Sequence, residues 1–259
     1  MSEADLALAL RMADAADAIS LERYRALDLR VELKPDRTPV TDADRAVELA
    51  LREIVHAERP EDGVLGEEFG SEDRGSRQWI LDPIDGTANF LRGVPNWSTL
   101  IALAVEGVPA VGVVSAPAFG LRAWARRGGG AWLSERGGEP RRLAVSRVAE
   151  LADASLSFQS IAQWEDAGRL QQLLELRRAV WRDRAYGDMW SYILLAQGAL
   201  DVVAEFDVKP YDLAALVPLV EEAGGRFSSA EGAPGPWGGS SLASNGLLHD
   251  AVLARLAAS

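Results

Sequence analysis

The stretch that most constrains the fold of this chain runs from Trp79 to Phe90 and reads WILDPIDGTANF. Its apolar first half, which ends at Asp82, predicts a buried strand in a sheet whose two faces are both covered. Pro83 has no N–H to donate, so we expect it to end the strand. The carboxylates of Asp82 and Asp85 then follow the strand's carboxyl end, where open α/β sheets place their binding sites.

These groups suit a divalent cation. Mg²⁺ takes oxygen ligands in an octahedron, usually a few carboxylates together with water and substrate phosphate. Asp82 and Asp85 could bind one or two such ions, and the Ile84 carbonyl could complete a shell. Gly86 would let the backbone approach a ligand closely, and N–H groups at a following helix start would suit a phosphate. The alternative is a solvated Asp-Pro turn in which Asp85 caps a helix.

Composition excludes several classes of function. The 259 residues carry a net charge of −12, which argues against non-specific binding to nucleic acid and to anionic membrane surfaces. Cysteine is absent, so disulfides, thiolate zinc sites and a cysteine nucleophile are excluded. With only two histidines, His56 and His249, the composition argues against a Ser-His-Asp triad and against a histidine-rich metal site. Without a basic leader or an apolar run of about 18 residues, we expect a cytoplasmic protein.

The order of apolar and polar runs predicts one compact α/β unit over 1–259. We expect a metal-binding N-terminal lobe over about 1–145 and a C-terminal α/β lobe over about 150–259. Residues 3–27 predict an amphipathic helix, and residues 163–176 predict another. The middle third of the chain predicts a β-meander, because strand-like runs alternate there with Gly-rich turns.

Other carboxylates have adequate structural explanations when taken singly. Asp42 and Asp44 lie in the first turn of a predicted helix, where the helix dipole favours negative charge. Asp212 also begins a predicted helix. Glu67 and Glu68 follow a short strand, and we expect only one of them to face a shared site because successive residues of an extended segment point to opposite sides. Helix capping does not explain why all these acids occur together at these spacings.

The motifs together resemble the inositol monophosphatase family of Mg²⁺-dependent phosphatases. The resemblance spans most of the chain and rests on four segments: Gly66-Glu67-Glu68, the run from Trp79 to Phe90, Tyr211-Asp212-Leu213-Ala214-Ala215, and the later Glu221-Glu222-Ala223-Gly224-Gly225. Tyr211 stands where the family usually has tryptophan, and both are aromatic. The resemblance implies an α/β (α+β) fold, a layered αβαβα sandwich of the inositol monophosphatase and sugar phosphatase type, usually assembled as a homodimer.

Within that family, the chain is most similar to the actinobacterial-type histidinol-phosphatases. The supporting segments are residues 34–45, 63–70, 89–95 and 184–188. This similarity implies hydrolysis of a small phosphorylated metabolite, L-histidinol phosphate, in histidine biosynthesis. Two alternatives stay open: an inositol-1-phosphate or broad-specificity sugar-phosphate phosphatase with the same metal site, and a non-catalytic family member that acts as a binding protein.

The family's metal ligands can be carried over residue by residue. The resemblance implies that Glu67, Asp82 and the Ile84 carbonyl serve a first Mg²⁺ ion. It implies that Asp82, Asp85 and Asp212 serve a second, with two or three ions per site. Asp85 and Asp212 are also expected to contact the substrate.

The resemblance also implies the remaining site residues. Gly86 and Thr87 are expected to hold the phosphate. Asp44 matches the position that pairs with Thr87 and helps to activate the nucleophilic water, so that Asp44, Glu67 and Thr87 form the catalytic set. Lys34 matches a basic position near the loop that closes the metal site.

The leaving-group pocket is predicted from both resemblance and charge. Arg184 and Glu205 match family positions around this part of the substrate. Histidinol phosphate carries an amine and an imidazole, so Glu205 and Asp188 are candidates to meet these cations. Trp97 and Trp190 are candidate aromatic residues of the pocket.

Overall fold

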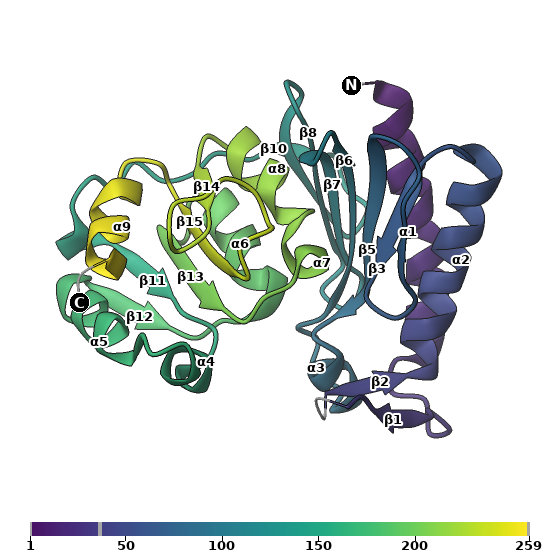
Figure 1. The fold of residues 1–259 in the computed structure, drawn as a ribbon, viewed down its shortest axis with the longest axis horizontal. Coiled ribbons are helices and arrows are strands. Elements are labelled where there is room, and N and C mark those ends of the chain that lie inside the picture. Colours follow the sequence, from purple (N-terminus) through teal and green to yellow (C-terminus); the bar gives the residue numbers. More distant parts are fainter. Residues whose placement is uncertain (1, 36–37, 258–259) are drawn as a thin grey trace.

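The computed structural model describes residues 2–35 and 38–257, and these form five layers (Figure 1). Two helices cover one face of a large sheet, a second pair lies between that sheet and a smaller one, and three more helices cover the smaller sheet's far face. The αβαβα order implied by the family resemblance is therefore confirmed. Asp36 and Arg37, within the segment 34–45 that supports the family resemblance, lie outside the described residues.

The large sheet has eight strands in the order β10-β9-β8-β7-β6-β5-β3-β4. Its strands are β3 (Gly63–Gly66), β4 (Gly70–Glu72), β5 (Arg77–Asp85), β6 (Ser98–Val105), β7 (Val108–Ala116), β8 (Leu121–Arg126), β9 (Gly130–Glu135) and β10 (Arg141–Arg142). From β5 to β10 each strand pairs antiparallel with the next, which confirms the predicted meander. The strand β3 instead runs parallel to β5.

The first helical layer covers one face of the large sheet. It consists of α1 (Glu3–Arg23) and α2 (Asp42–Glu58), and its apolar side chains pack on Trp79 and Leu81 of β5. The helix α1 ends four residues before the predicted boundary. A small two-stranded sheet, β1 (Val31–Leu33) with β2 (Pro39–Thr41), joins the two helices at the lower end in Figure 1.

The small sheet lies in the C-terminal half, in the order β12-β11-β13-β15-β14. Its strands are β11 (Ser155–Ser157), β12 (Arg182–Arg184), β13 (Val202–Phe206), β14 (Arg226–Ser228) and β15 (Ser240–Ser244). The middle helices, between the sheets, are α6 (Asp188–Ala196) and α8 (Leu216–Glu222). The outer helices are α4 (Ile161–Asp166), α5 (Leu170–Ala179) and α9 (His249–Ala257).

Two short helices adjoin these layers. They are α3 (Thr87–Leu91), directly after β5, and α7 (Pro210–Leu213), directly before α8. A single 3-10 turn (Leu151–Asp153) leads into the small sheet. Within the described residues, no helix combines the length and the apolar character needed to cross a membrane.

One predicted helix is interrupted. Residues 163–176 were expected to be continuous, but the chain forms α4 and α5 separately. Gly168 lies between them with a φ of +68°, a left-handed conformation that ends a helix and that glycine adopts at no steric cost. The apolar periodicity of the segment continues across this break, so periodicity alone did not reveal that the helix is interrupted.

Candidate functional site

The site begins at a break in the pairing of β5 with β6. The register of the two strands shifts between Asp82 and Asp85, and Pro83 lies inside the strand at this bulge. The expectation that Pro83 ends the strand was therefore wrong. The Thr99 hydroxyl donates to the Pro83 carbonyl at 2.8 Å, so a buried side chain supports the bulged backbone. The bulge puts both carboxylates at the same end of the strand.

A cavity of about 360 Å³ opens beside this bulge. Residues from four separate segments line it, and they include these predicted positions: Lys34, Glu67, Asp82, Ile84, Asp85, Gly86, Thr87 and Asp212. Glu67 follows β3, and Asp212 lies in the first turn of α7. The fold thus gathers into one cavity every residue that the resemblance assigns to the metal ions.

The carboxylates of this cavity raise one another's pKa. Asp82 is 2% exposed, and burial together with the charges of Glu67 and Asp85 raises the pKa of its carboxyl well above the usual value. Burial raises the pKa of Glu67 to about 7 and that of Asp212 to about 6. Burial and the nearby Asp188 raise the pKa of Asp85. Such crowding of negative charge is favourable only when cations offset it.

The donor set fits hard divalent cations. Asp82 Oδ1 is buried and has no hydrogen-bond partner among the described residues, an arrangement that costs free energy unless a ligand takes it up. All the side-chain donors are carboxylate oxygens, which Mg²⁺ prefers. Within the described residues, no three acidic or histidine side chains already converge tightly enough to hold an ion. Ion binding would therefore require some of these side chains to rotate.

Two of the carboxylates currently have other partners. Lys34 Nζ lies 2.7 Å from Glu67 Oε1 and 2.7 Å from Glu68 Oε1. Asp212 Oδ2 accepts the Lys209 N–H at 2.7 Å, where it caps α7 as the helix-start explanation anticipated. Burial alone would lower the pKa of Lys34, but its hydrogen bonds to both glutamates raise it. The ammonium of Lys34 thus offsets part of the site's negative charge.

Only one of Glu67 and Glu68 lines the cavity, as expected, but the strand alternation given as the reason does not apply to them. Glu67 lines the cavity and Glu68 does not, yet both carboxylates reach the same lysine. The chain has already left β3 at Gly66, so the alternation of an extended strand no longer applies to them. The buried side chain of Glu48 on α2 holds the turn that follows β3. Its carboxylate accepts the N–H groups of Glu68 at 2.7 Å and Phe69 at 3.2 Å.

Asp44 makes both of the contacts considered for it, one at the helix start and one with Thr87. Its Oδ2 accepts the backbone N–H and hydroxyl of Thr41, which form the capping box at the start of α2. Its Oδ1 accepts the Thr87 hydroxyl at 3.0 Å. The Thr87 hydroxyl also lies 3.0 Å from the Ile84 carbonyl. Burial raises the pKa of the Asp44 carboxyl, and the cap and the site share this one carboxylate.

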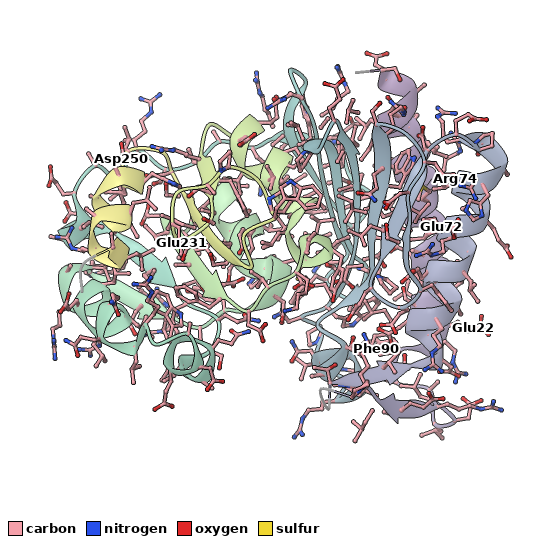
Figure 2. All side chains as sticks on the ribbon, in the orientation of Figure 1. Glu22, Glu72, Arg74, Phe90, Glu231 and Asp250 are labelled. Carbon is pink, nitrogen blue, oxygen red and sulfur yellow. The ribbon has the colours of Figure 1, made fainter. Side chains whose placement is uncertain are left out.

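Gly86 is fixed by its surroundings as well as by its backbone angle. Its φ is +82°, and a Cβ at this position would lie 2.9 Å from the Asn96 carbonyl oxygen. The turn therefore needs glycine for two independent reasons. Below it, Phe90 at the foot of the large sheet (Figure 2) packs edge-on against Trp97 and contacts Tyr24. Trp97, a candidate pocket residue, is thus fully buried in this cluster.

Two predicted substrate residues lie outside the lining of the metal cavity. Glu205 is 3% exposed on β13, and its Oε2 accepts the Tyr192 hydroxyl at 2.9 Å. Burial raises the pKa of Glu205 to about 8, with Asp188 and Asp212 also contributing. Arg184 is exposed on β12 and donates to the Asp183 carbonyl. Their substrate roles stay predictions.

A second cavity, of about 560 Å³, adjoins the first. Asn89 lines it, three residues after Gly86 of the metal cavity, and so do Asp188 and Trp190. Asn96 and Gln159 also line it, and the sequence reasoning missed both. Each is a single amide in a loop, so one sequence offered no spacing or pairing that could have identified them.

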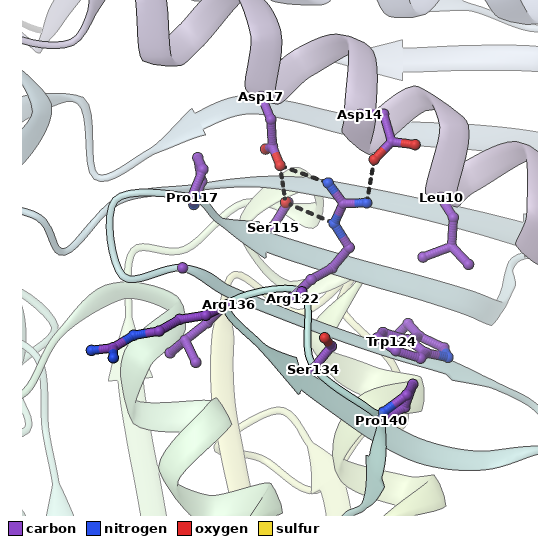
Figure 3. Close-up of a pocket in the computed structure, with 13 residues that line it drawn as sticks. Leu10, Asp14, Asp17, Ser115, Pro117, Arg122, Trp124, Ser134, Arg136 and Pro140 are labelled. Carbon is purple, nitrogen blue, oxygen red and sulfur yellow. Dashed lines mark hydrogen bonds and ion pairs between the residues drawn. The ribbon is translucent and has the colours of Figure 1, made fainter.

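A further cavity, of about 570 Å³, lies between α1 and β8 (Figure 3). There Arg122 connects Asp14 and Asp17 of α1, with Nη1 and Nη2 contacts of 2.5 Å and 2.6 Å, and it also donates to Ser115. Its lining contains none of the predicted site residues. The two ion pairs attach α1 to the large sheet.

The chain is similar to known proteins over nearly its whole length. The family model described as "Inositol monophosphatase family" matches residues 2–259. The chain is 58% identical over 257 residues to a histidinol-phosphatase of Mycobacterium tuberculosis, covering 99% of each chain. It is 51% identical over 256 residues to a histidinol-phosphatase of Streptomyces coelicolor, covering 97% of this chain and 96% of that one.

A solved structure is also similar over nearly the whole chain. It is an inositol monophosphatase from Zymomonas mobilis, with a TM-score of 0.86, 34% sequence identity and 98% of each chain covered. Fold, motifs and full-length similarity therefore agree, and this chain belongs to the inositol monophosphatase family.

Proposed function

We propose that this chain is a Mg²⁺-dependent phosphomonoesterase that hydrolyses L-histidinol phosphate to L-histidinol and phosphate. The observation that carries the proposal is one cavity in which Asp82, with an unpartnered buried oxygen, lies among Glu67, Asp85 and Asp212. The substrate is proposed from the two histidinol-phosphatases to which the chain is 58% and 51% identical. Retention of every ligand position argues against a non-catalytic binding protein.

In this proposal the ions bind to the carboxylates and to one backbone carbonyl. Glu67, Asp82, the Ile84 carbonyl, Asp85 and Asp212 would together hold two or three Mg²⁺ ions. Bound Mg²⁺ offsets the charge of the phosphoryl oxygens and lowers the pKa of a coordinated water. Gly86 and Thr87 would hold the phosphate. Lys34 would release Glu67 as the ions bind.

Thr87 and Asp44 would move the proton of the attacking water. The Thr87 hydroxyl donates to Asp44 Oδ1, which leaves a lone pair on Thr87 Oγ1 free to accept. As water attacks phosphorus, it would give its proton to Thr87 Oγ1 while Thr87 passes its own proton to Asp44 Oδ1. The bond from phosphorus to the leaving oxygen breaks in line, and the leaving alkoxide takes up a proton from solvent. The raised pKa of Asp44 favours this transfer.

Phosphate release from a substrate panel tests the proposal. L-Histidinol phosphate, inositol 1-phosphate, fructose 1,6-bisphosphate and 3′-phosphoadenosine 5′-phosphate would each be assayed with Mg²⁺ and with EDTA. We expect a strong preference for L-histidinol phosphate that EDTA abolishes. Comparable rates on inositol or sugar phosphates would keep the chemistry and reject the substrate. Release from none of them would support the non-catalytic alternative.

Assembly and location belong to the same proposal. We propose a homodimer, as the family resemblance implies, and a cytoplasmic location, as expected of a biosynthetic enzyme. Light scattering on purified protein would test the first, and fractionation of the source cells would test the second.

A further inference from the structure

The second cavity has a charge and a shape that the metal site does not explain. It adjoins the metal cavity through Asp188, whose Cγ and Oδ2 lie 3.5 Å from the position of a Cβ on Gly86. Its volume of about 560 Å³ is within the range of small-molecule pockets. A phosphate held at Gly86 and Thr87 would leave the rest of a substrate facing this cavity.

Asp188 supplies the cavity's charge. Among the described residues that line the cavity, Asp188 alone is charged. Its Oδ2 accepts the side-chain N–H groups of Asn89 at 2.8 Å and Asn96 at 3.0 Å, and its Oδ1 accepts that of Gln159 at 3.2 Å. No ion pair joins it to a lysine or arginine of the described residues. Three neutral amides therefore fix the carboxylate and leave its negative charge uncompensated.

Backbone hydrogen bonds around Asp188 also hold its carboxylate in this position. Asp188 has a φ of +49°, an uncommon conformation for a residue other than glycine. Its N–H donates to Gln159 Oε1 at 2.8 Å, and the next N–H, that of Met189, donates to Asp85 Oδ2 at 2.9 Å. The segment that presents Asp188 is thus attached to the metal site itself.

The rest of the lining supplies acceptors and aromatic rings. Asn96 Oδ1 and Gln163 Oε1 are buried oxygens without a hydrogen-bond partner among the described residues. Phe119 and Trp190 lie with their ring centroids 5.0 Å apart. A carboxylate, unpaired acceptors and aromatic rings together suit a ligand that donates hydrogen bonds and carries positive charge.

We propose that this second cavity receives the leaving group and that Asp188 selects leaving groups that carry a cation, such as an ammonium or imidazolium. This inference rests on the proposed phosphatase function and adds to it the residue that sets substrate class. A neutral polyol would leave the charge of Asp188 without a counter-ion. A phosphomonoester of a cationic amino alcohol would pair with it.

The test compares Asp188→Asn with the wild type on two substrates of different charge. Asparagine keeps nearly the same shape and tolerates a positive φ, so the change removes mainly the charge. We expect the ratio of kcat/KM for L-histidinol phosphate to that for glycerol 2-phosphate to fall by about tenfold to a hundredfold, as loss of a charged hydrogen bond implies. Calorimetry of L-histidinol binding in EDTA adds a readout without turnover, and we expect weaker binding by the variant.

Glu165→Gln is the matched control, because Glu165 is an exposed acid on the nearby helix α4 and its change removes the same charge. We expect this control to keep the wild-type ratio. An equal loss on both substrates in Asp188→Asn, or unchanged L-histidinol binding, would contradict selection by Asp188 while leaving the phosphatase proposal intact. A wild type that hydrolyses glycerol 2-phosphate faster than L-histidinol phosphate would overturn the proposed substrate and the selection together. Absence of any Mg²⁺-dependent hydrolysis would overturn the proposed function itself.

Discussion

Asp82 combines deep burial, a negative charge and a proposed role as a metal ligand. Its carboxylate is almost fully buried, carries an unpartnered oxygen and lies beside three other acids of the cavity. No Lys or Arg of the described residues pairs with it. Such a group destabilises the fold unless a cation binds, and proteins retain that cost where function requires it.

The first prediction removes this charge. Asp82→Asn should lower kcat/KM with Mg²⁺ by several orders of magnitude, because the bound ions supply most of the charge stabilisation in the transition state. Steady-state phosphate release measures the effect, and Asp250→Asn, an exposed acid on α9, serves as the control. Wild-type activity in Asp82→Asn would reject the metal assignment.

A second residue prediction concerns His249, which is distant from the metal site in the sequence and fully buried. Its ring nitrogens lie 3.0 Å from the hydroxyls of Ser228 and Ser244. Burial lowers the pKa of His249 to about 4, against about 6.5 in an unfolded chain. The unfolded state therefore binds more protons between these values, so stability is lost as pH falls from about 6.5 towards 4.

His249→Gln should remove this part of the pH dependence. We expect the wild type to lose about 2 kcal/mol of unfolding free energy from this group between pH 7 and pH 5. Urea unfolding at the two pH values measures the loss, with His56→Gln, a partly exposed histidine on α2, as the control. If His249→Gln kept the full wild-type difference, the buried histidine would not be its source.

At the scale of elements, α2 positions the turn that carries Glu67. Glu48 is fully buried on this helix, pairs with Arg52 Nε at 2.8 Å and accepts two backbone N–H groups after β3. Arg52 in turn donates to the Gly70 carbonyl. Gly66 leaves room for this carboxylate, because a Cβ there would lie 1.9 Å from Glu48 Oε1. Helix α2 and Gly66 together fix the position of Glu67.

Glu48→Ala tests this support. The change leaves Arg52 and two N–H groups without their buried partner, and it should cost about 3 kcal/mol of unfolding free energy. Urea unfolding measures the cost, and a Mg²⁺ titration of activity should show weaker ion binding. Glu53→Ala, an exposed residue of the same helix, should change neither quantity. Equal behaviour of the two variants would contradict the proposed role of Glu48.

Across the whole molecule, the metal cavity joins parts of the chain that are far apart in sequence. Asp82 and Asp85 belong to the large sheet, and Asp212 precedes α8 of the middle layer. Asp85 also accepts the Met189 N–H at the start of α6. Repulsion among these carboxylates therefore acts between layers, and relief of that repulsion should stabilise the entire fold.

Mg²⁺ should accordingly raise the melting temperature of the wild type. A ligand that binds only the folded state at a concentration of 100 times its Kd adds about 2.7 kcal/mol. Thermal unfolding with MgCl₂, against NaCl of equal ionic strength, measures the shift. The shift should shrink strongly in Asp212→Asn and in Asp82→Asn. An unchanged shift in both variants would show that Mg²⁺ binds elsewhere.

Much of this architecture could be predicted from local sequence. The run from Trp79 to Asp82 predicted a strand buried on both faces, and its alternate side chains do pack on different layers. Glycine-rich turns predicted the meander. The proposed metal ligands followed from the family motifs, because their spacing in the chain is specific even where each acid alone has a helix-capping explanation.

Tertiary structure decided what depends on contacts between distant segments. Pro83 stays within β5 because Thr99 of the neighbouring strand supports the bulge, and Glu67 and Glu68 share Lys34 because Glu48 of α2 turns the chain. The three amides around Asp188 come from helix α3 and from two separate loops. The sequence by itself determined the chemistry of the groups and the elements that carry them, since both depend on neighbours in the chain. Only packing of the layers decided which groups meet and how strongly they are buried, because those energies arise between residues that the sequence holds far apart.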